Sequence, residues 1–93
     1  MKTTIIYGPA MSGKTLLAGG LFQQLRQHVQ DSKGLITDIG YPDSHKMALQ
    51  EFKYEIDRAS AVKCTYLILV TCAKPSDEVL ALADYVIETR RSR

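Results

Sequence analysis

Apolar positions along the chain fall into two kinds of run. Short runs rich in β-branched and aliphatic side chains predict strands at residues 3–7, 35–39, 65–71 and 85–89. Between them, apolar side chains recur every three or four residues, which predicts helices over about 14–30 and 45–62 and a short one over about 77–83. Strands that alternate with helices are typical of a parallel sheet covered by helices. We therefore predict one α/β domain over residues 1–93, a three-layer sandwich with a small, mainly parallel sheet of about four strands and helices on both faces.

The patterns also predict which side chains face the sheet. The run 65–71 is apolar almost throughout, so we expect burial on both of its faces and a central place in the sheet. In the first helix the expected inner stripe consists of Leu17, Leu21, Leu25 and Val29, with Ala18 and Phe22 beside it. In the second helix it consists of Ala48, Phe52, Ile56 and Ala59. Gly19 and Gly20 each cost the first helix ~1 kcal/mol relative to alanine, and we interpret them as sites of close packing against the sheet.

A phosphate-loop pattern, G-x-x-x-x-G-K-[ST], lies between the first strand and the first helix, and it consists of Gly8, Pro9, Ala10, Met11, Ser12, Gly13, Lys14 and Thr15. The two glycines admit backbone conformations closed to other residues, so that backbone N–H groups can point inward at the helix N-terminus and bind an anion. Lys14 can reach the β- and γ-phosphates, and the Thr15 hydroxyl can ligate Mg²⁺. The pattern predicts a site for ATP or GTP with Mg²⁺; a glycine-rich turn without a ligand is the alternative interpretation.

Two strand ends supply the other candidate site residues. Asp38 ends the second predicted strand and is the natural carboxylate to hold magnesium through water, although an ordinary aspartate in a turn is the alternative. Thr71 ends the third predicted strand and is a candidate polar sensor of the γ-phosphate, although a threonine that simply suits a strand is equally compatible. The candidate catalytic residues are therefore Lys14, Asp38 and Thr71, and the candidate metal ligands are Thr15 and Asp38.

Composition adds few constraints. The formal net charge of +2 is too small to predict nucleic-acid binding, although the basic end Arg90-Arg91-Ser92-Arg93 is a candidate contact for a phosphate backbone; a solvated chain end is the alternative. Cys64 and Cys72 lack the spacing of a zinc site and are expected to be reduced thiols. Because no apolar stretch approaches the ~20 residues of a membrane span and the N-terminus has no signal-peptide core, we expect a cytoplasmic protein that does not contact a membrane.

With these residues, the chain resembles the P-loop NTPase superfamily, of the RecA-like or additional-strand type in a shortened form. Residues 8–15 resemble the Walker A motif and residues 35–38 a reduced Walker B motif, while 67–76 and 83–88 are similar to the sensor strand and the strand after it. Parts of the chain are also similar to DNA-pumping ATPases, to ATP-dependent corrinoid adenosyltransferases and, in the loop, to zinc-containing thymidine kinases. The chain departs from these relatives in lacking a strand–helix unit between the two Walker motifs.

The resemblance implies a Mg²⁺-dependent NTPase with slow or partner-stimulated hydrolysis, in DNA handling or assembly. Many hydrolysing members carry a glutamate directly after the Walker B aspartate, whereas Ile39 follows Asp38 here, and we favour none of the nearby acids Asp43, Glu51 and Glu55 in its place. This departure favours the second hypothesis, a nucleotide-binding regulatory or interaction module without turnover. A small-molecule kinase or ATP-dependent transferase is the third. Arg90 and Arg91 would reach a neighbour's nucleotide only in a ring or dimer, so a homo-oligomer also stays open.

Overall fold

The computed structural model describes residues 1–9, 13–28, 33–40 and 45–90. Within these ranges the elements follow one another as β1 (Lys2–Tyr7), α1 (Lys14–His28), β2 (Gly34–Gly40), α2 (His45–Ala61), β3 (Tyr66–Thr71), α3 (Asp77–Leu80) and β4 (Tyr85–Glu88). Each predicted strand and helix is present at its expected place. The short helix α3 ends at Leu80, earlier than the predicted position of about 83, and its N-terminus is capped by the Ser76 hydroxyl, which accepts a hydrogen bond from the Val79 N–H.

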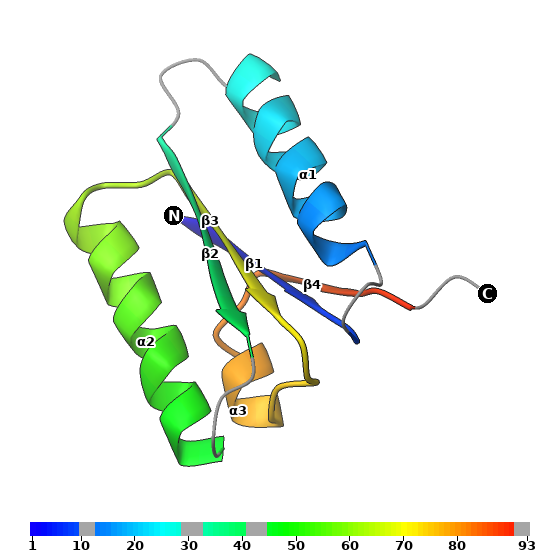
Figure 1. The fold of residues 1–93 in the computed structure, drawn as a ribbon. Coiled ribbons are helices and arrows are strands. Elements are labelled where there is room, and N and C mark those ends of the chain that lie inside the picture. The colour runs from blue at the N-terminus through cyan, green and yellow to red at the C-terminus, as the bar shows by residue number, and fades with distance from the viewer. Residues whose placement is uncertain (10–12, 29–32, 41–44, 91–93) are drawn as a thin grey trace.

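The strands in the described part of the chain form one parallel sheet in the order β2-β3-β1-β4. The long helix α1 lies on one face of this sheet, and α2 and α3 lie on the other (Figure 1). The predicted three-layer α/β sandwich is therefore confirmed. The central place of β3 is confirmed as well, because β3 has a strand on each side and all of its residues are buried.

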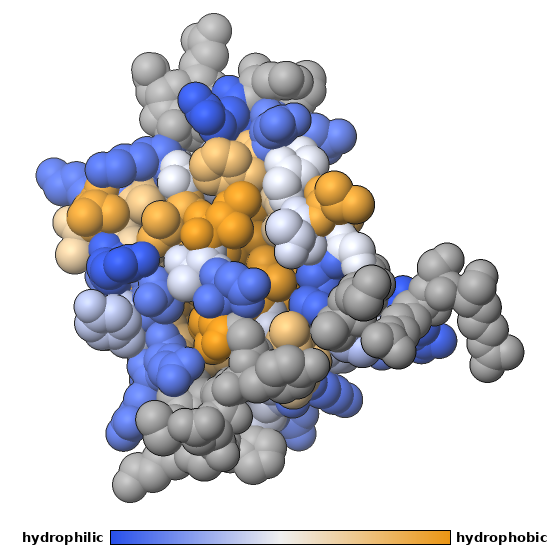
Figure 2. Space-filling model, in the orientation of Figure 1, coloured by the Kyte–Doolittle hydropathy of each residue, from blue (hydrophilic) through white to orange (hydrophobic). Residues whose placement is uncertain are grey.

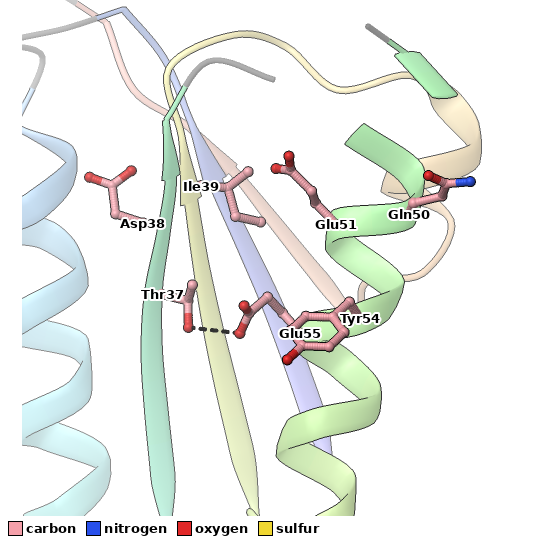
Figure 3. Close-up of a pocket in the computed structure, with 7 residues that line it drawn as sticks. All are labelled: Thr37, Asp38, Ile39, Gln50, Glu51, Tyr54 and Glu55. Atoms are coloured by element: carbon pink, nitrogen blue, oxygen red, sulfur yellow. Dashed lines mark hydrogen bonds between the residues drawn. The ribbon is translucent and has the colours of Figure 1, made fainter. Parts of the chain in front are cut away.

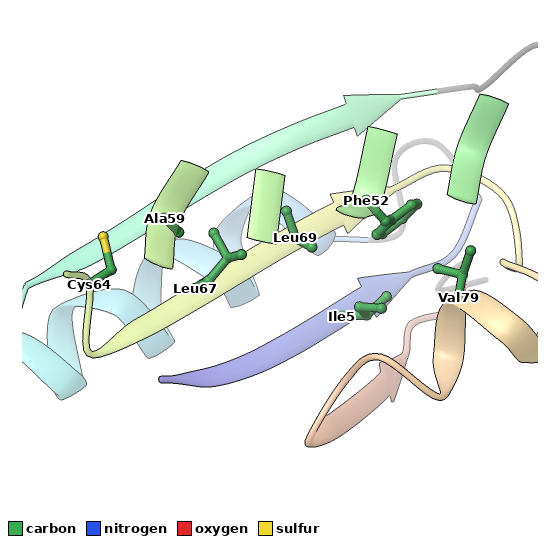
Figure 4. Close-up of a cluster of buried hydrophobic side chains, with 7 residues drawn as sticks. All are labelled: Ile5, Phe52, Ala59, Cys64, Leu67, Leu69 and Val79. Carbon is green, nitrogen blue, oxygen red and sulfur yellow. The ribbon is translucent and has the colours of Figure 1, made fainter. Parts of the chain in front are cut away.

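Alternating side chains of β1 and β3 build a core on each face of the sheet. On the side of α2 and α3, Ile5, Leu67 and Leu69 pack with the helix residues Phe52, Ala59 and Val79 and with Cys64 (Figure 4). On the side of α1, Ile6, Ile68 and Val70 pack with Ala18, and Leu21, Phe22 and Leu25 extend this cluster. Since successive strand residues point to opposite faces, one apolar run supplies both cores.

The predicted inner stripe of α2 is confirmed where its side chains are described, since Phe52 and Ala59 are fully buried and Ile56 packs against the core. The side chain of Ala48 lies outside the described residues. In α1 the prediction was wrong for Leu17, whose side chain is 41% exposed. Lys14 and Ala18 of α1 are buried, and Leu21, Phe22 and Leu25 are partly buried against the core, as predicted for Ala18 and these three residues. Val29 lies outside the described residues.

The close-packing interpretation of Gly19 and Gly20 was also wrong. A Cβ atom added at either position would meet no other atom within 4 Å, so neither glycine is required by contact with the sheet. The close approach is at Gly34 instead, where an added Cβ would overlap the ring of Tyr66 on the neighbouring strand. Tyr66 in turn packs edge-on against Phe22 of α1, with 5.6 Å between the ring centroids.

The edge strand β2 exposes part of its apolar surface. Figure 2 shows apolar side chains gathered along β2, between the two long helices, with hydrophilic side chains around them. Ile36 of β2 is 37% exposed and belongs to this surface. Cys64 and Cys72 are unpaired thiols, as expected. In the described ranges, no helix combines the length and hydrophobicity that a membrane span requires.

Candidate functional site

The phosphate-loop sequence leaves the sheet at its carboxyl edge. The Gly8 N–H donates a hydrogen bond to the Thr71 carbonyl at 3.3 Å, so the loop begins beside the end of β3. At the other end, Gly13 has a φ of 85°, a conformation that glycine adopts without steric cost. Its carbonyl accepts the first hydrogen bond of α1, from the Leu17 N–H at 2.9 Å. Ala10, Met11 and Ser12, which belong to the predicted site, lie outside the described residues.

Lys14 connects the two ends of this loop. Its side chain is only 7% exposed, and its ammonium donates a hydrogen bond to the Pro9 carbonyl at 2.8 Å. Burial of an ammonium is costly unless a polar partner compensates for the lost water. The carbonyl of Pro9, its hydrogen-bond partner among the described residues, satisfies one of the three N–H donors of the ammonium. The first residue of α1 is therefore a buried cation directed across the loop.

The start of α1 adds to this positive potential. The first N–H groups of a helix have no acceptor inside the helix, and the helix dipole makes this end positive. The first turn of α1 contains no acidic residue that would offset this charge. A cavity of about 360 Å³ opens here, lined by Gly13, Lys14, Thr15 and Leu16. Its chemistry suits an anion.

Thr15 and Asp38, the two candidate metal ligands, face a common space. Thr15 of α1 and Asp38 of β2 both line a second cavity, of about 170 Å³, together with Ala18, Gly19, Ile36 and Val70. In Figure 3 the Asp38 carboxylate lies on the side of β2 that faces α1. The described residues contain no group of three or more metal-ligating His, Cys, Asp or Glu side chains. A magnesium ion that arrives with phosphates needs only one or two protein oxygens, which a hydroxyl and a carboxylate can supply.

Thr71 reaches the loop through its backbone. Its carbonyl accepts the hydrogen bond from Gly8, and the residue is fully buried. The alternation along β3 places Thr71 on the same face as Leu67 and Leu69, which pack toward α2. The proposed role of its hydroxyl as a sensor stays a prediction.

The acidic residues of α2 lie on the other side of β2 from Asp38. Glu51 and Glu55 line a pocket of about 390 Å³ between β2 and α2, which Asp38 also borders although its carboxylate lies on the other side of β2 (Figure 3). Glu55 accepts a hydrogen bond from the Thr37 hydroxyl at 3.3 Å and pairs with Arg58 at 3.0 Å. Ile39 also points to this side and packs against the core. The strand therefore separates both glutamates from the Asp38 carboxylate, while Asp43 lies outside the described residues.

The sequence patterns did not predict that Gly19 belongs to the candidate site. Gly19 lines the cavity that contains Thr15 and Asp38, whereas we had interpreted it as a packing glycine. The available signal was its position four residues after Thr15, which places both on one face of α1. Arg90, a candidate for contact with a neighbouring nucleotide, has a side chain that is 86% exposed and lies 3.9 Å from Glu88. Arg91 lies outside the described residues.

Comparisons with protein-family models, with curated proteins and with solved structures found no significant match. The structure itself establishes a small α/β domain with a four-stranded parallel sheet in its described part.

Proposed function

We propose that this chain binds a nucleoside triphosphate, ATP or GTP, with Mg²⁺ through a P-loop, and hydrolyses it slowly or when a partner stimulates it. The observation that carries the proposal is the Lys14 ammonium, buried and directed across the loop to the Pro9 carbonyl. A phosphate group carries a full negative charge, so a phosphate oxygen would be a stronger hydrogen-bond acceptor for the Lys14 ammonium than the Pro9 carbonyl is. The adjacent helix N-terminus would add its N–H groups to the same anion.

The order of the strands supports the same proposal. Strand β3 lies between β1, which leads into the loop, and β2, which carries Asp38. The resemblance to the additional-strand type implies one strand between the strand that leads into the loop and the strand that carries the aspartate, which is the place of β3. The residues of the described site fit Mg²⁺, since Thr15 would offer a hydroxyl and Asp38 a carboxylate from opposite walls of one cavity. Bound there, the ion would neutralise charge on the phosphates.

Nucleotide binding without turnover is the second candidate function. Ile39 occupies the position where hydrolysing relatives carry glutamate, and it packs into the core on the side of α2. Glu51 and Glu55 border a pocket that Asp38 also lines, but in Figure 3 their carboxylates lie on the opposite side of β2 from the Asp38 carboxylate. On this proposal the chain serves as a regulatory or interaction module that binds nucleotide without hydrolysing it.

Replacement of Lys14 by methionine tests nucleotide binding directly. Lys14→Met keeps much of the side-chain length and removes the charge, so the affinity for Mg·ATP should fall at least about tenfold, equivalent to about 1.4 kcal/mol. The ligand-free protein should not lose stability, because the variant no longer buries a cation. Equilibrium titration with a fluorescent ATP analogue and thermal denaturation measure the two effects.

Lys53→Met is the matched control, since Lys53 is exposed on α2, and it should leave both quantities unchanged. Phosphate release by the wild type, measured in parallel, separates slow hydrolysis from binding alone. Equal affinity of wild type and Lys14→Met for Mg·ATP and Mg·GTP would contradict the proposal.

A further inference from the structure

We infer that a cavity at the amino edge of the sheet binds a small amphiphile with a carboxylate head and a hydrocarbon chain, which is the chemistry of a medium-chain fatty acid. The cavity has a volume of about 630 Å³ and lies beside α1, on the face of the sheet that α1 covers. None of the described residues that line it also lines the cavities beside Lys14, Thr15 and Asp38. The inference therefore does not depend on the proposed nucleotide site.

Three strands form the floor of the cavity. On β1, Lys2 and Thr4 lie on the same face as Ile6, which packs on the α1 side. The floor residues of the other two strands follow the same alternation, Tyr66 and Ile68 on β3 and Tyr85 and Ile87 on β4. Helix α1 packs most closely against β1, β2 and β3, and the α1 face of β4 borders the cavity instead. Because parallel sheets bury both of their faces, this part of the sheet is open to a ligand.

The inner part of the cavity is apolar. Leu21 and Leu25 of α1 form its side wall, and Ile68 and Ile87 lie on its floor. Tyr85 also lines the cavity and is 58% exposed, so its ring is available to a ligand. The volume falls within the ~300–1,000 Å³ of small-molecule sites, which are mostly apolar with a few polar groups. A hydrocarbon chain placed here would remove these side chains from water, which is favourable.

The outer end of the cavity is polar and lies where the strands begin. Lys2 is the first residue of β1, and it carries the only charge among the described residues that line the cavity. Its ammonium forms no ion pair with a described residue. Thr4 is nine-tenths buried, and its hydroxyl has no hydrogen-bond partner in the described part of the chain. A carboxylate accepts hydrogen bonds from an ammonium and from a hydroxyl, so it matches this end of the cavity.

The two ends of β1 separate this site from the proposed nucleotide site. The phosphate loop follows Tyr7 at the carboxyl end of β1, whereas Lys2 begins the same strand. At ~3.3 Å per residue, these two residues are roughly 17 Å apart along the strand. A carboxylate amphiphile and Mg·ATP would therefore bind without contact, and each can be assayed in the presence of the other.

A series of probes tests the chemistry of the ligand. Sodium hexanoate, octanoate and decanoate are titrated calorimetrically into the full chain, each below its micelle concentration. The affinity should rise about fourfold with each added CH₂ group, because each group is buried against apolar side chains. Octylammonium has the chain of octanoate and the opposite head charge. It should bind at least about tenfold more weakly than octanoate, because its head would face the Lys2 ammonium.

Reversal of the charge at Lys2 tests the polar end. In Lys2→Glu the affinity for octanoate should fall at least about tenfold, and the affinity for octylammonium should rise, because the charge at the end of the cavity is inverted. A purely structural effect would change both affinities in the same direction. Lys53→Glu makes the same substitution at an exposed position of α2 and should change neither affinity.

Two tryptophan substitutions on α1 test the apolar part. Leu25→Trp would fill the cavity and should lower the affinity for octanoate at least about tenfold. Leu17→Trp is the matched control, because Leu17 lies on the same helix, is exposed and is not among the residues that line the cavity. If Leu25→Trp also lowers the melting temperature, Lys2→Glu decides the question, since Lys2 is exposed and its substitution leaves the core unchanged.

Failure of the wild type to bind octanoate and decanoate would overturn the inference, as would an unchanged octanoate affinity in Lys2→Glu or equal losses in the two tryptophan variants. Binding to phosphatidylglycerol vesicles without binding of the free acids would assign the surface to a membrane and also overturn it. Lys14→Met should bind decanoate as the wild type does, and a loss there would place the carboxylate at the phosphate loop instead. Failure of the wild type to bind any nucleotide would refute only the proposed function.

Discussion

Lys14 and Asp38 show how single residues can be placed for function at some cost to the fold. Lys14 is a buried cation whose partner in the described part of the chain is the Pro9 carbonyl, and burial of an ammonium is costly for the fold. Asp38 lies two residues before the end of β2, where the register with β3 shifts between Asp38 and Gly40. Lys14 lines one of the two cavities beside α1, and Asp38 lines the other.

Asp38→Asn tests the metal role at this scale. The amide keeps the shape of the side chain but loses the negative charge that Mg²⁺ prefers, so the gain in ATP affinity on adding Mg²⁺ should shrink at least about fivefold, or about 1 kcal/mol. The affinity measured in EDTA should not fall. Titrations with and without Mg²⁺ give both values, and Asp57→Asn on the exposed side of α2 is the control. An unchanged magnesium dependence would remove Asp38 from the site.

At position 34, packing against Tyr66 requires a glycine. Gly34→Ala would place a Cβ atom in the ring of Tyr66, and over-filling of this kind should lower the free energy of unfolding by about 1–3 kcal/mol. Gly20→Ala makes the same substitution where nothing lies within 4 Å and should raise stability by up to about 1 kcal/mol. Urea denaturation of the two variants measures the contrast. Equal effects would mean that Tyr66 can move aside without cost.

At the scale of elements, the alternation of β2 explains the missing glutamate. Thr37 and Ile39 face α2 while Asp38 faces α1, so the residue after the aspartate belongs to the core on the opposite side of the sheet. An acid introduced at position 39 would therefore point away from the phosphates. Among the described strands, β2 lies at one edge of the sheet, with β3 as its neighbour.

Ile39→Glu follows from this geometry. The variant should not release phosphate faster than the wild type, because its carboxylate would lie on the α2 side of β2. It should also lower the free energy of unfolding by about 1–3 kcal/mol, since it places a charge against apolar side chains. Ile39→Leu should be nearly neutral in both assays. A several-fold rise in phosphate release from Ile39→Glu would show that the end of β2 can turn its side chain toward the nucleotide.

For the whole molecule, the site and the C-terminal segment share one edge of the sheet. Glu88 of β4 is in register with Tyr7, and the Thr89 N–H donates to the Tyr7 carbonyl at 2.8 Å, so the chain leaves β4 close to where β1 enters the loop. Arg90 follows directly and has an exposed side chain. The basic end therefore departs from the same edge as the proposed phosphate site.

Deletion of residues 90–93 separates a solvated end from a functional arginine. We expect the affinity for Mg·ATP to change by less than about twofold, because exposed charges contribute little in water. Bound nucleotide at 100 times its dissociation constant should still add about 2.7 kcal/mol to the stability of the truncated chain. Thermal shift and analytical ultracentrifugation with and without Mg·ATP check both affinity and oligomeric state. A large loss that appears only at concentrations where the chain self-associates would assign an arginine to a neighbour's site.

Much of the fold was predictable because its signals are local. The apolar run of β3 is too long for a strand with one exposed face, and this alone placed it inside the sheet. The conformation of Gly13 was predictable for the same reason, because a glycine at this place in the loop pattern indicates a positive φ. Leu17 and Gly19 were not, because a helix with apolar residues on several sides has no unique inner stripe until it packs.

The amino-acid sequence by itself determined the order of strands and helices, the loop between β1 and α1, and the apolar residues available for burial, since each depends on neighbours within a few positions along the chain. Only the tertiary structure decided that β3 separates β1 from β2, that the Asp38 carboxylate lies on the α1 side of β2 while Ile39 and the glutamates of α2 lie on the other side, and that Gly19 borders a cavity. These features depend on strand register and on the rotation of a helix about its axis, which are fixed by contacts between segments far apart in sequence.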